Sequence, residues 1–138
     1  MTTRFEEFEE WQKSRSLVCA IYGVTARGGF HRDPGLRERL RADAVCIMST
    51  LAVASDAAPA RRVRTVGRAA RTCSSLSSNL VVAFDQGYLT DVELCALHGQ
   101  ASDLRDAIRA RAVETAAQSE VTRDRARSEP EAASGGLR

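Results

Sequence analysis

Residues 60–87 read ARRVRTVGRAARTCSSLSSNLVVAFDQG, and their apolar and small residues recur at intervals of three and four. The repeat passes through seven positions, which are Val63, Val66, Ala70, Cys73, Ser77, Leu80 and Phe84. This alternation is typical of a seam between packed α-helices. Residues 79–84 alone could form a buried strand, but the upstream repeat and the missing hairpin dipeptide argue against one. We therefore expect a helix over about residues 60–86, with Gly87 where glycine commonly follows a helix end.

Two upstream segments have periodicity of the same kind. The first covers about residues 4–25 and is expected to end at Gly28 and Gly29, because glycine relieves the backbone geometry past a helix end. The second begins at Asp33-Pro34, since Asp is a good N-cap and Pro at the first helical position removes only an amide that lacks a partner. Its apolar face consists of Leu36, Leu40, Ala44, Ile47, Leu51 and Ala54.

The last helix has the clearest start signal. Thr90 and Glu93 have the spacing of a capping box, in which each side chain satisfies an end amide of the other. An apolar stripe then continues to about residue 115, after which the pattern fails. We expect residues 1–116 to form one domain, an all-α, antiparallel up-down-up-down four-helix bundle, and residues 117–138 to form a disordered tail.

Composition and charge exclude several classes of protein. The longest apolar runs, residues 44–48 and 80–84, are five residues long, whereas a membrane span needs about 20. The N-terminus is acidic where a signal peptide would be basic and then apolar, so the expected location is cytoplasmic. Several seam positions hold Ser or Ala, which bury little apolar area, so burial against other copies of the chain is also expected.

The charge of the chain is unevenly distributed. Residues 57–84 contain five Arg and no acid, although the whole chain has a net charge of only +2. These residues are Arg61, Arg62, Arg64, Arg68 and Arg71. Four of them are spaced three, four and three apart, which places them on one face of a helix, where guanidinium groups could bind phosphates without reading the base sequence. The alternative is a solvated face, or pairing with Glu6, Glu7, Glu9 and Glu10 of this or another subunit.

No cluster of catalytic or metal-binding residues emerges. The cysteines fall one per helix, at Cys19, Cys46, Cys73 and Cys95. The first and last lie roughly 7–9 Å from one end of the expected bundle and the middle two roughly 18–21 Å from it, at 1.5 Å per residue. They therefore cannot share one zinc ion, and we expect them to be buried small hydrophobic residues. His31 and His98 lack partners at ligand spacing, so we expect no enzyme activity, metal or cofactor.

Three stretches of the chain carry a resemblance to a known family. They are FEEWQKSR at 8–15, Leu40-Arg41 followed by Ala44-Val45, Ile47, Ser49 and Leu51-Ala52, and DQGYLT at 85–90. Together they resemble the 23S rRNA intervening-sequence proteins, also called four-helix-bundle proteins, over about residues 5–110. The resemblance implies a ring-like homo-oligomer, commonly a pentamer. A related branch serves diversity-generating retroelements, where a basic barrel binds a reverse transcriptase and nucleic acid.

The chain departs from the family pattern at several polar positions. The second helix has Met48, Thr50, Val53 and Ala54 where the family usually has Pro, Asn and a Glu-Gly pair, and the third has Ser75 and Ser77 in place of acidic residues. Roles of those positions are not carried over. Our leading hypothesis is a non-catalytic homo-oligomer that binds RNA, DNA or a nucleoprotein, possible partners including a reverse transcriptase. The alternatives are a structural scaffold without nucleic-acid binding and, last, a metal- or redox-active bundle.

Overall fold

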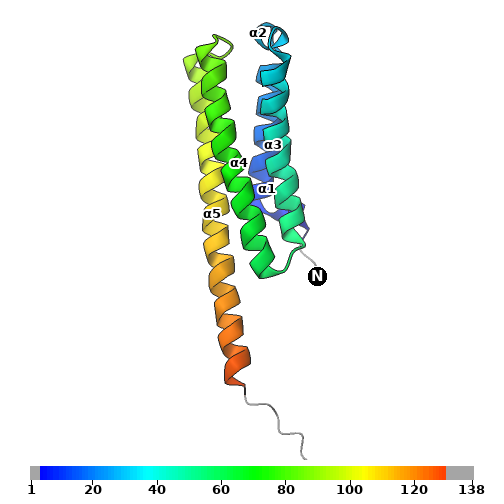
Figure 1. The fold of residues 1–138 in the computed structure, drawn as a ribbon, viewed down its shortest axis with the longest axis vertical. Coiled ribbons are helices and arrows are strands. Elements are labelled where there is room, and N and C mark those ends of the chain that lie inside the picture. Colours follow the sequence, from blue (N-terminus) through cyan, green and yellow to red (C-terminus); the bar gives the residue numbers. More distant parts are fainter. Residues whose placement is uncertain (1–3, 130–138) are drawn as a thin grey trace, which may run out of the picture.

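The computed structural model describes residues 4–129, in which every regular element is a helix. The four long helices are α1 (Glu9–Thr25), α3 (Pro34–Ser55), α4 (Pro59–Asp85) and α5 (Asp91–Ser128) (Figure 1). Two short elements, η1 (Phe5–Glu7) and α2 (Gly28–His31), lie at the ends of α1. The expected all-helical class with four long helices is confirmed, and residues 60–85 are helical as predicted.

The long helices pack side by side. Helix α1 contacts α3 and α5, α3 also contacts α4, and α4 contacts α5 along much of its length (Figure 1). The connections before α3 and before α5 lie together, because Arg27 forms an ion pair with Glu93 and the ring of Tyr88 lies against Phe30, with ring centroids 5.2 Å apart. No helix in the described part of the chain is long and apolar enough to cross a bilayer.

The predicted start signals of α3 and α5 are confirmed by their hydrogen bonds. The Asp33 side chain accepts a bond of 3.2 Å from the backbone N–H of Leu36. At α5, Thr90 accepts a bond of 3.2 Å from the N–H of Glu93, and Glu93 accepts one of 3.0 Å from the N–H of Thr90. These bonds satisfy amides that have no partner within the helix, which fixes where each helix begins.

The end of α4 is a Schellman turn built on Gly87. This residue has φ of +80°, a conformation that glycine adopts at little cost. Its N–H donates to the carbonyl of Phe84 and that of Tyr88 donates to the carbonyl of Ala83, both at 2.9 Å. The chain therefore reverses sharply, and α5 begins only a few residues later.

The first helix differs from the prediction at both ends. It begins at Glu9 because residues 5–7 form a separate 3-10 turn, and Phe8 stands as the extended N-cap. It ends at Thr25, and Gly28 and Gly29 do not terminate it but form the start of α2. Neither glycine has positive φ. Gly29 is instead required for close approach, because a Cβ atom there would lie 2.9 Å from Cδ1 of Tyr88.

The core lies along the facing sides of all four helices. The predicted stripe of α3 is confirmed from Leu40 to Ala54, and that of α5 from Leu97 to Ile108. In α4 the buried arc is wider than the predicted seam, since Ala69, Leu76 and Ala83 are also buried. The reason is that α4 packs against α3 on one side and α5 on the other, which buries more than a two-helix seam requires.

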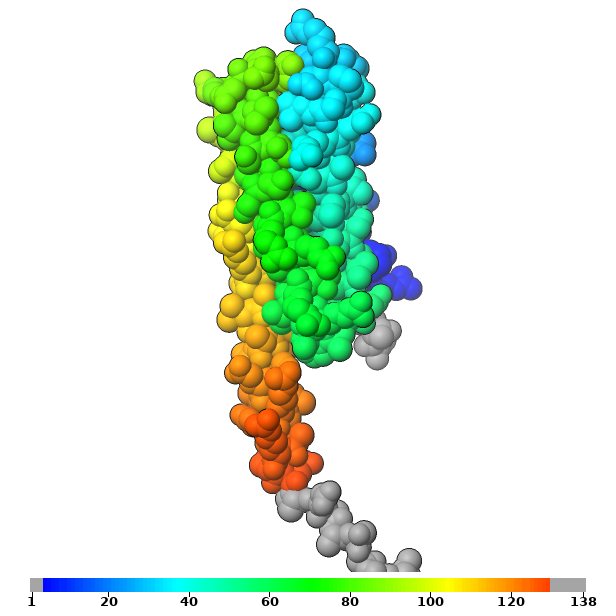
Figure 2. Space-filling model, viewed as in Figure 1, coloured from blue at the N-terminus to red at the C-terminus, as the bar shows by residue number. Residues whose placement is uncertain are grey.

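Helix α5 overturns the expected boundary at residue 117. It continues without a break to Ser128, so residues 117–128 are helical rather than disordered. Thr115 is its last buried residue, and residues 121–129 are all exposed (Figure 2). A segment rich in Ala, Arg, Glu and Gln has enough helix propensity to extend an existing helix without a core. The rest of the predicted tail, residues 130–138, lies outside the described residues.

Candidate nucleic-acid interface

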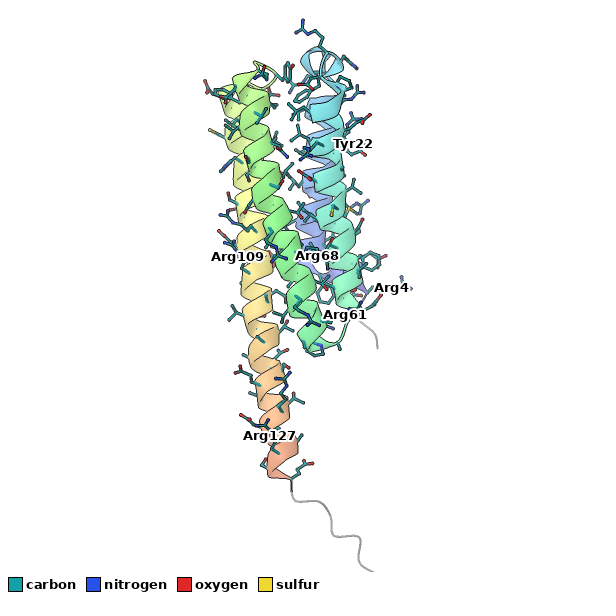
Figure 3. The ribbon with its side chains drawn as sticks, viewed as in Figure 1. Arg4, Tyr22, Arg61, Arg68, Arg109 and Arg127 are labelled. Atoms are coloured by element: carbon teal, nitrogen blue, oxygen red, sulfur yellow. The ribbon has the colours of Figure 1, made fainter. Side chains whose placement is uncertain are left out.

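Four of the five predicted arginines lie exposed along the outer face of α4. They are Arg61, Arg64, Arg68 and Arg71, and Figure 3 labels two of them. The opposite face of the same helix is turned to the core through Val66, Ala70 and Cys73. Within residues 4–129 no carboxylate lies within 4.0 Å of any of the four guanidinium groups. Their positive charge is therefore presented to solvent.

Arg62 has a different environment from its neighbours. Its Nε donates 3.1 Å to the carbonyl of Ala54, and its Nη2 donates 3.3 Å to that of Ser55 and 3.0 Å to that of Ala57. These carbonyls belong to the end of α3 and the loop after it, where helix carbonyls lack partners within the helix. Arg62 thus caps α3, and its hydrogen bonds hold it apart from the other four.

The acidic N-terminal segment does not neutralise the arginines of the same chain. Glu10 is buried and accepts a bond of 3.1 Å from Nε of Arg111. The Cζ atom of Arg111 also lies 5.3 Å from the ring centroid of Phe8. Glu9 pairs with Lys13 at 3.2 Å. Glu6 and Glu7 make no ion pair within the part of the chain that the structure describes. Pairing with the acids of another subunit stays a prediction.

Helix α5 brings two further arginines near Cys73 of α4. The positive charges of Arg105 and Arg109 on their own would lower the pKa of the Cys73 thiol, but burial raises it to about 11. Figure 3 shows Arg109 at about the same height as Arg68 on the neighbouring helix. Cys73 lies on the core face of α4, opposite the four exposed arginines, so Arg105 and Arg109 are not counted with them. We name Arg61, Arg64, Arg68 and Arg71 the basic surface.

Two acids of the neighbouring helices have partners away from the basic surface. The Asp106 carboxylate lies 3.7 Å from Nε of Arg105, beyond hydrogen-bond distance, and this Nε is buried without a hydrogen-bond partner. On α3, Asp43 accepts a bond of 3.1 Å from Nδ2 of Asn79. Burial raises the pKa of Asp43, partly offset by that bond and by the charge of Arg39. Neither carboxylate forms an ion pair with an arginine of the basic surface.

Sequence reasoning missed the effect of the α5 arginines on Cys73. In the sequence, Asp103 and Asp106 alternate with Arg105 and Arg109, which favours a solvated face of paired charges. Only the Arg105–Asp106 contact is found among these four in the structure. The usable signal was the short turn at Gly87, after which α5 packs along α4.

A pocket of about 100 Å³ is lined in part by Arg62. Its apolar walls include Phe8, Trp11 and Ile108, and the Glu10–Arg111 pair lines it as well. None of the four residues of the basic surface lines this pocket. Because its two cations are bonded to Glu10 and to the carbonyls of α3, the pocket does not extend the charge of the basic surface.

The cysteines do not form a site. Cys73 is buried as expected, but the prediction of burial is wrong for Cys19, Cys46 and Cys95, which are exposed because they lie outside the core arc of their helices. Among the residues that the structure describes, no three His, Cys, Asp or Glu side chains are grouped as metal ligands would be.

Comparisons of the chain with protein-family models, curated proteins and solved structures found no match. The function is therefore argued from the basic surface itself.

Proposed function

We propose that this protein is a non-catalytic, homo-oligomeric subunit that binds RNA, DNA or a nucleoprotein in the cytoplasm through its basic surface. The observation that carries the proposal is the row of four exposed guanidinium groups on α4 with no carboxylate within 4.0 Å in residues 4–129. Like charges on one helix face repel each other, and an acidic ligand relieves that repulsion. Phosphates suit arginine because the guanidinium fork binds two oxygens at once.

The proposed topology of the chain is an antiparallel up-down-up-down four-helix bundle. It is supported by the ion pair between Arg27 and Glu93 and by the contact of Tyr88 with Gly29, which join the connections after α1 and after α4. The bond from Arg62 to Ala54 joins the end of α3 to the start of α4. Short connections between helices favour antiparallel neighbours.

Homo-oligomerisation, in a ring such as a pentamer, is supported by three helical stretches without charged residues. Residues 16–26 of α1 and its C-cap, 72–84 of α4 and 94–102 of α5 contain no Asp, Glu, Lys or Arg, and we name their exposed side chains the uncharged surface. On α4 it includes Val81 and Val82, each at least 40% exposed. Depletion of charge and exposure of aliphatic groups are typical of the centre of protein interfaces.

The same surface favours the second candidate, a structural scaffold that contacts proteins alone. In that case Arg61, Arg64, Arg68 and Arg71 would form ion pairs with acids of neighbouring subunits. The two candidates differ in what happens when these arginines are removed, since a scaffold would lose its assembly and a nucleic-acid binder would lose its ligand.

The experiment compares two triple variants of equal charge change. Replacement of Arg64, Arg68 and Arg71 by alanine should weaken binding to RNA or DNA at 50 mM salt at least tenfold. The reason is that the variant neutralises fewer phosphates, so its binding releases fewer counterions than that of the wild type. Replacement of Arg123, Arg125 and Arg127, exposed on the distal part of α5, is the matched control and should change it little. The native mass of the assembly should be the same for the wild type and both variants. Loss of assembly in the first variant would favour the scaffold instead.

A reverse transcriptase is the partner that the family resemblance suggests. The proposal is that the bundle acts as its accessory subunit, with the basic surface holding the nucleic acid that the polymerase copies. A reverse-transcriptase gene beside this one, and co-purification of the two proteins, would support that role. A purified polymerase that does not bind the bundle with or without RNA would contradict it.

A further inference from the structure

The composition of the basic surface restricts the kind of nucleic acid that it can hold. Proteins that bind single strands combine positive charge with aromatic side chains on which the unpaired bases stack. Helix α5 contains no Phe, Tyr or Trp, and the one aromatic residue of α4, Phe84, packs against the core. The aromatic side chain with the largest exposure in residues 4–129 is Tyr22, which lies on α1 (Figure 3). Unpaired bases therefore find no stacking partner on this surface.

The shape of the basic surface leads to the same conclusion. Arg61 and Arg71 are ten residues apart on one helix, which is about 15 Å at 1.5 Å per residue. All four arginines stand on the outer face of this one helix. Neither of the two best-formed pockets in the described residues is lined by any of them, so the charges stand on the outside of a rod and not in a channel for a strand.

We infer that the basic surface binds the outside of a double helix and discriminates against single strands. This inference rests on the proposed function. A duplex carries one negative charge per about 1.7 Å of its axis, against one per about 3.4 Å for each strand. A 15 Å length of duplex axis therefore carries roughly nine phosphate charges against roughly four for one strand, and those on its near side are held where the row can reach them. A duplex also holds its phosphates in fixed positions, whereas a flexible strand without stacking contacts must be ordered by charge alone.

The test measures binding of the full-length protein to a 20-base-pair A·U RNA duplex and to the 20-nucleotide U strand alone, at one salt concentration. The duplex should bind at least about tenfold more tightly. The same comparison with A·T DNA shows whether the preference belongs to duplexes in general. A 2-aminopurine base placed in a single strand should show no change in fluorescence on binding, because no side chain stacks on it.

Two variants connect the preference to the residues. Replacement of Arg64 and Arg68 by alanine should weaken duplex binding about three- to tenfold, with the exposed pair Arg123 and Arg125 as the matched control. Equal affinity for duplex and single strand, or tighter binding of the single strand, would overturn the inference and leave the proposed function intact. Failure of both ligands to bind at 50 mM salt would overturn the proposed function itself.

Discussion

Arg62 reaches from the start of α4 to the end of α3, where its Nε donates a hydrogen bond of 3.1 Å to the carbonyl oxygen of Ala54. Two further bonds from its Nη2 go to Ser55 and Ala57. Its neighbour Arg61 is exposed and makes no ion pair with any described carboxylate. Two adjacent arginines therefore have separate tasks, since one stabilises a helix end and the other contributes charge to the surface.

This difference predicts opposite effects of two neighbouring substitutions. Arg62→Ala should lower the free energy of unfolding by about 1–2 kcal/mol, because three carbonyls lose a charged donor, and should leave nucleic-acid affinity nearly unchanged. Arg61→Ala should leave stability within about 0.5 kcal/mol and weaken binding. Urea denaturation and a binding titration check both. The assignment fails if Arg62→Ala weakens binding as much as Arg61→Ala without loss of stability.

The half-buried pair of Glu10 and Arg111 should contribute to stability by joining α1 to α5. Glu10→Ala removes a largely buried carboxylate, but the Arg111 side chain is 41% exposed and can be solvated, so the free energy of unfolding should fall by only about 1–1.5 kcal/mol. The exposed pair of Glu9 and Lys13 is the control, and Glu9→Ala should cost less than about 0.5 kcal/mol. Equal losses in the two variants would show that the Glu10 contact adds no more stability than a surface ion pair.

The contact of Gly29 with Tyr88 predicts an asymmetry between two adjacent glycines. Gly29→Ala places a methyl group 2.9 Å from the Tyr88 ring, which must move, so the variant should lose about 1–3 kcal/mol of stability. Gly28 has open space around its Cβ position, and Gly28→Ala should be neutral or slightly stabilising. Thermal unfolding of both variants distinguishes them. If Gly29→Ala were as stable as Gly28→Ala, the two connections would not be packed together as described.

Asp43 predicts a pH dependence of stability. Burial raises its pKa in the folded protein above the value of 3.8 for an exposed Asp, so the folded state holds the proton more tightly than the unfolded state. As the pH falls through the window between the two values, this group adds stability, and at neutral pH its ionised form costs stability. Asp43→Asn keeps an oxygen for Asn79 and should melt higher than wild type at pH 7, with the difference shrinking toward pH 4. A variant that melts lower at pH 7 would contradict this.

Local sequence signals were sufficient for most of the fold. The caps at Asp33 and Thr90 and the glycine at 87 are each decided by a few neighbouring residues, so the sequence predicts them well. The role of Gly29 depends on Tyr88, which is 59 positions away, and no local pattern reports such a contact. The extension of α5 past residue 117 was missed because periodicity detects buried faces, whereas that segment is helical by propensity and is exposed.

The placement of the arginines was predicted in part for the same reason. The spacing of Arg61, Arg64, Arg68 and Arg71 is enough to place them on one face, and the structure places all four there, exposed. The capping role of Arg62 and the effect of Arg105 and Arg109 on Cys73 both arise between different helices. A single sequence does not contain that information in any one window.

The most direct test of the central claim is the salt dependence of binding of the wild-type protein to duplex RNA. If the four arginines of the basic surface contact phosphates, the logarithm of the binding constant should fall with the logarithm of salt concentration with a slope of about −3.5. A slope shallower than about −1, or no binding at 50 mM salt, would contradict a phosphate-binding role for the basic surface.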